Sequence, residues 1–600
     1  MATVTNTIKL PDGSTPSHAA VEIELVASTT SKAAGWVTAD DTTILSVARP
    51  TVTNGAWSAS LTPNADITPS GTVYKITEYA DRHRYINYIS VGSAGGSVFD
   101  LLVDPPTELG SSPAFVRAGA VISPSGDETG ATDRAALAAA IIEAEYALGP
   151  VFMRPGTYYV DAQIAKSVPL DIWACPGSVT IIKTMDAPVF RVTGTVGSPV
   201  SLTSNMTAGS ATVACDTSGF AVGDLVVVGH AQAAWSGAST QYQGQQAKVK
   251  TITDGTSMVL EDPAYTTFLT SASAFVMKVN SVAGIRIRGV KFSSTLASNT
   301  TAMVQLKYVS DVDIDIESEK SGHAALRVQH GFNVAAKVKA YRGYDVSDPD
   351  GSGLANQFGY GVEITGASSQ ATLDVDARRV RHAVVVGGIS GEYGEPNNVL
   401  VRGVGIGCTT ATWDCHSSGV NVVFSDCLSY GSAGPGFMLR GRGTIVSGGL
   451  SSGDNRGFDI YENGHGAHVT GLRVRDAVAH GGRVYQGVDN VLIEGCDFDG
   501  TGLSAIRFSG SGSFTAPRII RNTFRSIGEL GTSGDRSAIV VTGTGAVLDR
   551  ALQIEAVPLQ FDIEAIIKCF SQRIQLLCCG AGGDTSAGRS SSIVIEIGRA

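Results

Sequence analysis

The chain has 600 residues, of which 71 are glycine, 16% are charged and only 7% are aromatic, and its formal net charge is -11. A negative net charge argues against a nucleic-acid-binding surface. No apolar run reaches membrane-spanning length, and the first ten residues (MATVTNTIKL) lack the basic and apolar regions of a signal peptide. The sequence therefore predicts no nucleic-acid partner, no membrane insertion and no signal peptide. So much glycine without a collagen repeat is typical of short strands joined by tight turns.

Residues 1–103 alternate between apolar and polar positions in short runs, such as VEIEL at 21–25 and YKITEY at 74–79. Turn signals separate these runs, so we expect a small antiparallel β-sandwich. We see no paired acids, nucleophile or ligand cluster in this region, which favours an attachment or interaction role over catalysis. Residues 104–125 are a predicted linker, because Pro105 and Pro106 block both helix formation and strand pairing.

A helix and the first coils of a solenoid are expected at 126–201. The motif GDETGATD at 126–133 leads into an alanine-rich run that ends at Gly149-Pro150, and the turn PGTY follows at 155–158. This order of motifs resembles the N-terminal part of the pectate-lyase-like β-helix superfamily, to which phage tailspikes and tail-fibre depolymerases belong. The resemblance implies a right-handed parallel β-helix, with the helix capping its open end.

Residues 202–278 interrupt the solenoid pattern. They contain a polar loop, QYQGQQ at 241–246, and a hairpin signal at Asp254-Gly255. We expect a small β subdomain inserted between early coils, similar to inserts in tailspikes. Trp235 and Tyr242 in its loops could stack on a sugar ring or simply pack on the subdomain itself.

Residues 279–548 carry the repeat of the main parallel β-helix. A small residue followed by two apolar positions spaced by one recurs about every 21–25 residues, apart from a few longer coils. These small residues are Ala325, Gly361, Ala383, Thr412, Gly436, Gly457, Gly482, Ala505 and Ala538. No coil can bury its apolar face alone, so stacking of the coils supplies the core.

Residues 549–600 lack the repeat, and this C-terminal segment is either a trimerisation segment or the truncated end of a longer protein. The predicted fold class is therefore all-β. It comprises a right-handed parallel β-helix preceded by a small N-terminal antiparallel β-sandwich, with a small β insert and a short C-terminal segment.

The stretch from 411 to 440 predicts the best candidate site. Trp413 and Cys415 alternate with polar residues, so if they point inward, Asp414 and His416 must point outward. One coil later the inward pair is repeated by Phe437 and Leu439, which places Arg440 on the outer face close to His416.

Aligned coils give two outward columns. The first column is expected at Arg327, Glu363, Val385, Asp414, Met438, Asp459 and Val484. The second is expected at Gln329, Thr365, Gly387, His416, Arg440, Tyr461 and Gln486. Glu363, Asp414 and Asp459 would then lie two coils apart, about 9–10 Å. That spacing is near the upper limit for an inverting glycosidase, which needs roughly 6.5–9.5 Å for its water.

We therefore name Asp414, His416, Glu363 and Asp459 as candidate catalytic residues. Arg440 could bind a uronate or sialate carboxylate as a fork. The other candidate substrate-binding residues are Arg327, Tyr461, Arg381 and His382. The alternative is that such residues are solvated charges or ladders that fix strand register. No cofactor or metal is predicted; calcium stays an alternative at Asp345, Asp348 and Asp350, but that loop departs from the EF-hand spacing and a solvated loop is favoured.

Together these features, with the resemblance, predict a phage tailspike or tail-fibre protein carried in the virion. Its N-terminal domain would attach to other tail proteins, and its β-helix would bind a host-surface polysaccharide and depolymerise it. Glycoside hydrolysis by paired carboxylates on the outer face is favoured over a lyase reaction. The resemblance also implies a homotrimer. Two alternatives stay open: a binding-only fibre without catalysis, and a secreted polysaccharide lyase or hydrolase.

Overall fold

The computed structural model describes residues 1–10, 14–26, 35–37, 43–44, 48–68, 72–81, 83–103, 120–147, 149–237, 240–296, 300–343, 359–510, 513–528, 538–542, 547–549, 552–556, 575–577 and 592–596. The chain divides into two compact units. The first comprises Met1–Asp161, Leu170–Ile182 and Arg286–Lys291, and the second comprises Ala162–Pro169, Lys183–Ile285 and Phe292–Ala600.

The N-terminal part of the first unit consists of small sheets. Their strands are β1 (Ala2–Thr7), β2 (Ala19–Val26), β3 (Gly35–Val37), β4 (Thr43–Ile44), β5 (Ala56–Leu61), β6 (Ile67–Thr68), β7 (Val73–Ala80), β8 (His83–Ile89) and β9 (Gly96–Ser97). β2, β7 and β8 pair antiparallel, as do β1 and β5, whereas β9 runs parallel to β1. The inward residues Val4, Ile23, Ile76 and Ile89 share one apolar core. Alternation of buried and exposed positions therefore produces antiparallel sheets here, as predicted.

Helix α1 (Ala131–Ala147) follows β10 (Ala120–Ile122) in the first unit. The carboxylate of Asp133, buried in its first turn, accepts hydrogen bonds from the backbone N–H groups of Ser125 (2.7 Å) and Tyr159 (2.9 Å). This side chain thus fastens the start of the helix to two neighbouring segments. It explains why an acidic residue stands at the helix start, where it also meets the positive end of the helix dipole.

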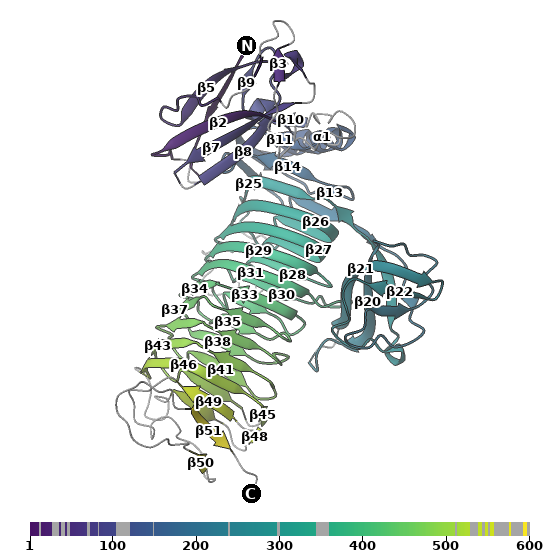
Figure 1. Ribbon diagram of the computed structural model, residues 1–600, viewed down its shortest axis with the longest axis vertical. Helices are drawn as coiled ribbons and strands as arrows, with labels where there is room; N and C mark the ends of the chain where they lie inside the picture. Colours follow the sequence, from purple (N-terminus) through teal and green to yellow (C-terminus); the bar gives the residue numbers. More distant parts are fainter. Residues whose placement is uncertain are drawn as a thin grey trace. The chain divides into compact units, whose positions relative to one another are not determined.

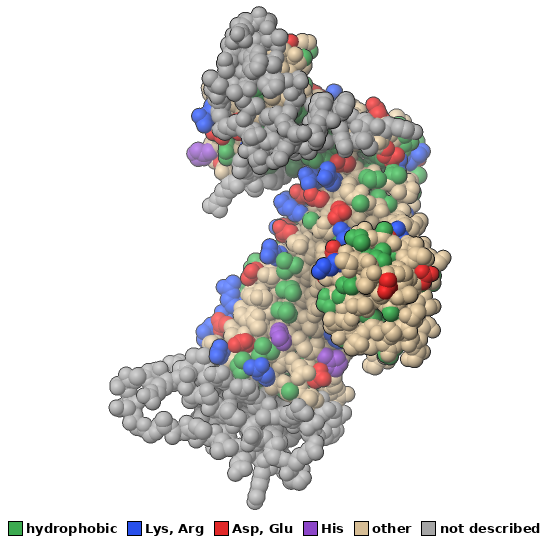
Figure 2. All heavy atoms as spheres, turned by 45° about the vertical axis from the view of Figure 1, so that its right-hand side comes forward, with side chains coloured by type: hydrophobic (Ala, Val, Ile, Leu, Met, Phe, Trp, Pro, Cys, Tyr) green, Lys and Arg blue, Asp and Glu red, His purple; other side chains and the backbone are tan. Residues whose placement is uncertain are grey.

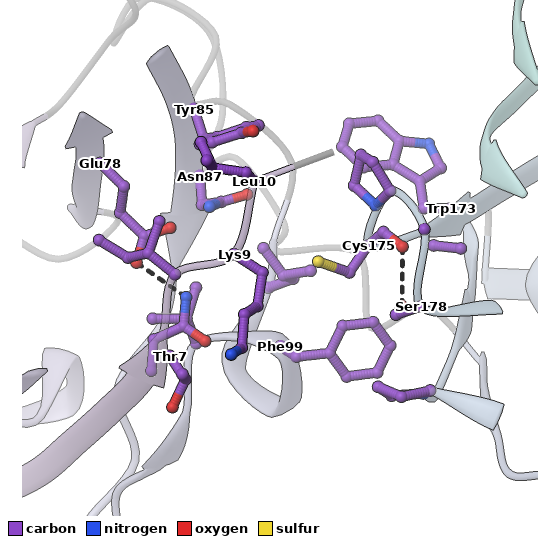
Figure 3. A pocket seen from close by; sticks show the side chains of 18 residues that line it. Thr7, Lys9, Leu10, Glu78, Tyr85, Asn87, Phe99, Trp173, Cys175 and Ser178 are labelled. Carbon is purple, nitrogen blue, oxygen red and sulfur yellow. Dashed lines mark hydrogen bonds between the residues drawn. The ribbon is translucent and has the colours of Figure 1, made fainter. Parts of the chain in front are cut away.

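The same unit holds the first solenoid coils and a cavity of about 370 Å³. The coil strands are β11 (Val151–Met153), β12 (Gly156–Val160), β14 (Asp171–Ala174), β15 (Val179–Lys183) and the start of β25 (Arg286–Ser294). Val151 pairs with Ile172, which pairs with Ile287, so the coils stack in parallel. Lys9, Tyr85, Phe99, Trp173 and Cys175 are among the residues that line the cavity (Figure 3).

The second unit contains the main parallel solenoid (Figure 1). Its first strands are β13 (Ile164–Lys166), β16 (Phe190–Thr193), β24 (Val282–Ala283), β26 (Val304–Glu319), β27 (Ala324–Tyr341), β28 (Tyr360–Thr365), β29 (Ser369–Arg378), β30 (His382–Gly387), β31 (Asn397–Ile406), β32 (Trp413–Cys415), β33 (Val420–Ser425) and β34 (Leu428–Tyr430). The later strands are β35 (Pro435–Leu439), β36 (Ile445–Ser447), β37 (Leu450–Ser452), β38 (Arg456–Ile460), β39 (His468–Thr470), β40 (Arg473–Arg475), β41 (Gly482–Tyr485), β42 (Leu492–Glu494), β43 (Asp497–Thr501), β44 (Ile506–Ser509), β46 (Arg518–Ile527) and β47 (Ile539–Thr542). β45 (Ser513–Thr515) and β48 (Val547–Asp549) pair with each other in a separate two-stranded sheet.

One column of inward residues runs through successive coils of this solenoid. In register order it contains Phe190, Val304, Leu326, Val362, Val384, Trp413, Phe437, Phe458, Gly482, Ile506 and Ile539. Trp413, Phe437 and Phe458 are fully buried, as the sequence repeat predicts. The apolar side chains of stacked coils therefore form a continuous core, which fixes the register of the outward side chains between them.

The insert in the second unit is an antiparallel sheet beside the solenoid (Figure 1). Its strands are β17 (Thr195–Val196), β18 (Val200–Ser201), β19 (Thr212–Ala214), β20 (Leu225–Ala233), β21 (Tyr242–Asp254), β22 (Ser257–Leu260) and β23 (Phe275–Asn280). It has its own apolar core, and a second cluster packs Leu225, Val227 and Val279 of the insert against Phe332 and Ala367 of the solenoid. The insert is thus anchored through apolar contacts to the coils that precede the candidate site.

Parallel stacking continues past residue 548, the predicted end of the main β-helix. Arg518 of β46 pairs in parallel with Gln553 of β49 (Leu552–Ala556). Strand β51 (Ser592–Glu596) then pairs antiparallel with both β49 and β50 (Gln575–Leu577). Within the described ranges no helix is long and apolar enough to cross a bilayer.

Candidate active site on the outer face of the solenoid

The first outward column lies on strands β27, β28, β30, β32, β35, β38 and β41. Its members in register are Arg327, Glu363, Val385, Asp414, Met438, Asp459 and Arg483. The three predicted carboxylates therefore occupy one column and are separated by two coils each, as the aligned repeat predicts. The column has Arg483 in its last place, where the aligned repeat had predicted Val484.

The shift from Val484 to Arg483 has a packing cause. Gly482 takes the inward place that holds a large apolar residue in neighbouring coils, because the Phe458 ring fills this space: an added Cβ at Gly482 would lie 2.1 Å from that ring. The small position of this coil is thus Gly481. The register of this coil is therefore one residue earlier than predicted. Val484 points inward, and Tyr485 takes the outward position predicted for Gln486.

Asp414 is the centre of the site and its side chain is fully buried. Nη2 of Arg440 donates to both of its carboxylate oxygens at 3.0 and 2.8 Å, and Nε2 of His416 lies 3.1 Å from Oδ2. Burial alone raises the pKa of Asp414, but the charges of Arg440 and His416 outweigh it and hold that pKa well below its usual range. Asp414 therefore stays ionised and serves as an acceptor rather than as a proton donor.

His416 is the most accessible group around this carboxylate, with 38% of its side chain exposed. Because Nε2 faces an ionised oxygen, it carries the hydrogen, and Nδ1 is left as the basic nitrogen. Within the described part of the chain Nδ1 has no hydrogen-bond partner. The imidazole lies over Gly387, where an added Cβ would be 2.8 Å from Cβ of His416 and 3.3 Å from Nδ1. A glycine at 387 is thus needed for this ring position.

Arg440 links Asp414 to a second acidic residue that the sequence did not reveal, Glu462. Nη1 of Arg440 lies 4.0 Å from Oε2 of Glu462, and the hydroxyl of Ser417 donates to the same oxygen. Glu462 is 37% exposed and has a left-handed backbone, with φ of 57°. It stands at the turn after β38, so strand alternation could not place it. Its side chain lies beside Ser417, which follows His416 in the chain.

Tyr461 flanks Arg440 on the outer surface. The Arg440 guanidinium lies 5.6 Å from the Tyr461 ring centroid, and the ring of Tyr485 is 5.2 Å from that of Tyr461. Both tyrosines are partly exposed. Arg440 and Tyr461 thus lie in the second outward column as predicted. The tyrosine rings in this column lie beside the charged cluster of Asp414, His416 and Arg440.

His382 and Arg381 lie behind the site. His382 is 3% exposed, and its Nδ1 donates to the carbonyl of Ala411 at 2.7 Å, so Nε2 faces Asp414 at 3.6 Å without a hydrogen. Burial lowers the pKa of His382 to about 4, and it is neutral at pH 7. Its ring stacks on Tyr360, which also receives Nη1 of Arg381 at 3.4 Å. His382 and Arg381 are therefore part of the packing around Tyr360 next to Asp414, behind the exposed part of the site.

Glu363 is bound by two basic side chains and is 8% exposed. Nε2 of His323 lies 2.6 Å and Nε of Arg327 lies 2.7 Å from its Oε2. Glu363 and Arg327 occur in the predicted column, but they form an ion pair with each other rather than pointing freely into solvent. The pairing of Glu363 with a histidine and an arginine resembles that of Asp414 with His416 and Arg440.

Asp459 is 2% exposed and is held between two arginines. Nε of Arg456 donates to both carboxylate oxygens at 3.0 Å, and Arg483 donates to the same oxygens at 3.2 and 2.9 Å. Burial raises the pKa of Asp459, while hydrogen bonds from Arg483 and the charge of Arg456 oppose that rise. One arginine provides the charge compensation that a buried carboxylate requires, and the second leaves the cluster with one positive charge in excess.

The insert reaches the solenoid close to this site through the turn at 388–395. The hydroxyls of Thr240 and Ser390 form a hydrogen bond of 2.7 Å, and the rings of Tyr242 and Tyr393 contact each other at an angle of 30° with centroids 5.1 Å apart. An added Cβ at Gly388, next to the glycine beneath His416, would lie 2.7 Å from Oε1 of Gln241. Tyr242 therefore packs on the solenoid turn. Trp235 is partly exposed in the insert loop.

Ion pairs also hold this turn. Glu392 receives His330 at 2.5 Å and Lys307 at 2.6 Å, and these contacts lower the pKa of Glu392 to about 2. Glu395 is fully buried, accepts the Tyr265 hydroxyl of the insert and faces Arg442 at 3.8 Å. The position of the insert is thus coupled to the coils that carry His416.

Across the described ranges, no three His, Cys, Asp or Glu side chains are grouped so that they could hold a metal ion. The calcium-like loop of Asp345, Asp348 and Asp350 lies outside the described residues. Seen as spheres, basic and acidic side chains are interspersed along the visible side of the solenoid (Figure 2).

The fold and the site together define a parallel β-helix with a half-exposed histidine, a guanidinium and a carboxylate on its outer face. Such a set can transfer a proton and bind an anionic or hydroxyl-rich ligand. Among solved structures, the tailspike protein gp49 from Pseudomonas phage LKA1 has a TM-score of 0.51 and 14% identity, over 77% of this chain and 88% of that one. The Gp54 tailspike of Acinetobacter baumannii bacteriophage AP22, solved with capsular saccharide, has a TM-score of 0.50 and 13% identity, over 77% and 90%.

These likenesses confirm the predicted fold class, a tailspike-like parallel β-helix. In sequence, a capsule K1-specific depolymerase of Klebsiella phage K64-1 is 28% identical over 258 residues, which are 40% of this chain and 27% of the relative. The match thus spans about a quarter of that relative's length. No protein-family model matches the chain.

Proposed function

We propose that this chain is a phage tail protein that binds a host-surface polysaccharide and depolymerises it at the cluster of Asp414, His416 and Arg440. The observation that carries the proposal is the half-exposed imidazole of His416, oriented by a buried, ionised carboxylate. A buried carboxylate of this kind fixes the tautomer of a histidine that acts as a general base. The capsule depolymerase named above and the tailspike fold support the polysaccharide as substrate class.

For the reaction, we favour hydrolysis of a glycosidic bond. Nδ1 of His416 takes a proton from the water that attacks the anomeric carbon. The carboxyl group of Glu462 gives a proton to the glycosidic oxygen as the bond between this oxygen and the anomeric carbon breaks. Hydrolysis needs one acid and one base on opposite sides of the bond. In this proposal Glu462 takes the role first considered for Glu363 or Asp459, because each of those carboxylates already binds two basic groups.

A second candidate reaction is elimination, and one observation favours it: the half-exposed base is a histidine rather than a carboxylate. In that reaction Nδ1 of His416 removes the proton next to a uronate carboxylate. The electron pair forms a carbon–carbon double bond, and the glycosidic oxygen leaves and takes up a proton. Such a mechanism requires a base and a positive charge near the carboxylate, which Arg440 could supply.

The remaining parts of the proposal concern assembly. The N-terminal sheets of the first unit would attach the protein to other tail proteins in the virion, and three copies of the chain would form the spike. The order of the modules along the chain and the likeness of the fold to tailspikes support both attachment and trimer formation. Velocity sedimentation of the purified chain measures the second one directly.

The test is a product assay on purified host capsular polysaccharides, with reducing ends and near-ultraviolet absorbance of unsaturated products measured in parallel. Wild type is compared with His416→Ala, Asp414→Asn and Glu462→Gln. The matched control is His465→Ala, since His465 also pairs with a carboxylate, Asp489 at 2.7 Å, and is equally exposed at 38%.

Reducing ends that form without absorbing products, disappear in the three site variants and persist in the control support hydrolysis, because elimination also leaves a reducing end. Absorbing products lost in His416→Ala but retained in Glu462→Gln support elimination. Polysaccharide binding without any product would overturn depolymerisation in favour of a binding-only fibre.

A further inference from the structure

A second polar cluster lies on the same face, beyond the proposed catalytic cluster. It consists of Asp459 with Arg456 and Arg483, and we call it the arginine clamp. Both arginines bind the same buried carboxylate, so the cluster holds two positive charges and one negative charge. Arg456 and Arg483 are 20% and 23% exposed, whereas Asp459 is 2% exposed. The carboxylate is therefore hidden beneath, and the surplus positive charge faces the surface.

Each arginine keeps donors for a further partner. Arg483 uses Nε and Nη2 for Asp459, and Arg456 uses Nε for Asp459 and Nη1 for Asn455 at 2.6 Å. Nη1 of Arg483 and Nη2 of Arg456 make no hydrogen bond among the described residues. A guanidinium presents its donors as a planar fork, which suits a carboxylate.

Tyrosine rings lie beside the clamp. The Arg483 guanidinium lies 4.4 Å from the Tyr485 ring centroid, and Tyr485 contacts Tyr461, which in turn lies against Arg440. The surface from Arg440 to Arg483 thus combines partly exposed aromatic rings with guanidinium groups. A sugar ring packs its C–H face on such aromatics, and charged substituents then reach the neighbouring cations.

Charges on another face of the same solenoid follow a different pattern. Asp315, Lys337, Asp374 and Arg402 succeed one another in register, so acidic and basic residues alternate from coil to coil. Such alternation neutralises each charge within the protein and stabilises register. The arginine clamp departs from it, because one buried carboxylate serves two cations. A ladder that only fixed register would not need the second arginine.

We infer that the arginine clamp is a subsite for the carboxylate of an acidic sugar, so that the polysaccharide is anionic. The inference rests on the proposed function and names its substrate class. Arg483 stands three coils from Asp414, about 14 Å along the solenoid. A glycan laid along the coils would meet His416 at the bond to be cleaved and the clamp at a sugar residue farther along the chain.

The experiment measures binding rather than cleavage, so it stays informative if the reaction assigned above is wrong. Purified capsular polysaccharides are used in native form and after carbodiimide-mediated reduction of their carboxyl groups. Binding to immobilised polymer is measured with the His416→Ala background, which prevents turnover, and with Arg483→Gln added to it. The matched control is Arg475→Gln, because Arg475 also pairs with a carboxylate, Asp497, and is 27% exposed.

For the native polymer that binds, we expect Arg483→Gln to weaken affinity roughly 10- to 100-fold, the range for one charge-assisted contact. Carboxyl reduction should weaken the Arg483-containing protein at least as much and should weaken Arg483→Gln less, because only Arg456 of the clamp remains in that variant, while Arg475→Gln matches its parent with both polymers. If Arg483→Gln fails to fold, the effect of carboxyl reduction on the parent protein decides alone.

Equal binding of native and reduced polymer by the parent protein overturns the anionic-substrate inference and leaves polysaccharide binding intact. A loss on reduction that is as large in Arg483→Gln as in its parent places the carboxylate elsewhere and overturns the assignment of the clamp. No binding to any capsular polysaccharide overturns the proposed function together with this inference.

Discussion

Nε2 of His416 lies 3.1 Å from Oδ2 of Asp414, and the same carboxylate receives Arg440 at 2.8 Å. One buried anion thus orients two functional groups on adjacent coils. Its removal is therefore expected to affect both catalysis and local structure. Comparison of variants at these positions can separate the two effects.

Asp414→Asn is expected to lower kcat by about 10³- to 10⁴-fold, because an amide lets the imidazole turn to the wrong tautomer. KM should change less, since substrate contacts through Tyr461 remain. Steady-state kinetics on the cleaved polysaccharide measure both constants. His416→Gln should show a similar loss in kcat, whereas an unchanged kcat in either variant would place the reacting base elsewhere.

Asp459→Asn is expected to destabilise the protein by about 3–5 kcal/mol, because it leaves two partly buried guanidiniums without their carboxylate. The midpoint of urea denaturation, followed by far-ultraviolet circular dichroism, reports the change. Asp497→Asn is the matched control: Asp497 is 26% exposed and binds Arg525 at 2.7 Å. A surface pair of this kind contributes below about 1 kcal/mol. Equal losses in the two variants would contradict the special burial of Asp459.

The sequence predicts the outward orientation of the catalytic candidates wherever large apolar residues occupy the inward positions of the strand. Trp413 and Cys415 are both buried, so alternation placed Asp414 and His416 correctly on the outer face. Alternation failed at Gly481-Gly482, since two adjacent glycines do not reveal which one faces inward. The Phe458 ring of the preceding coil determines that Gly482 faces inward, because it fills the space beside this glycine.

Other site features depend on contacts that no local pattern contains. Glu462 lies in a turn with a left-handed φ, so period-two alternation gives it no direction. The burial of Asp414 results from Arg440, His416 and His382, which come from three different coils. A sequence pattern predicts an exposed outward carboxylate there, and only the stacked side chains make it a buried ion pair.

Glu395 predicts a pH dependence of stability. Burial raises its pKa to about 7 from 4.5, although the Tyr265 hydroxyl and Arg442 oppose the rise. Below pH 4.5 both folded and unfolded chains hold this proton. As the pH rises from 4.5 to 7, the unfolded chain releases it and the folded chain keeps it, so the free energy of unfolding falls. The difference of 2.5 pKa units corresponds to about 3 kcal/mol.

Glu395→Gln should remove this decline. Relative to wild type, the variant should gain up to about 3 kcal/mol as the pH is raised from 4.5 to 7. Urea denaturation of both proteins across this range measures the difference in free energy of unfolding. The buried, neutral His382 changes stability with pH in the opposite direction, but its contribution is the same in both proteins and cancels in the difference. A difference that stays constant with pH would show that Glu395 is already ionised in the folded protein.

Gly403 and Gly407 predict losses of stability of different size for the same substitution. Both have a positive φ, of 137° and 61° respectively. An added Cβ at Gly403 would lie 1.9 Å from the carbonyl oxygen of Val375 in the adjacent coil, whereas nothing lies within 4 Å at Gly407. Gly407→Ala therefore costs only the backbone strain of a left-handed residue, about 1–2 kcal/mol.

Gly403→Ala must in addition push two paired strands apart, because the contact is with backbone that no side-chain rotation can relieve. We expect a loss of about 3 kcal/mol or more, with faster amide exchange in β29 and β31, the strands that Val375 and Gly403 join. Since coils contact only their neighbours, exchange in β46 should remain close to wild type. Equal losses for the two alanine variants would mean that the coils at 375 and 403 are spaced more widely than the register requires.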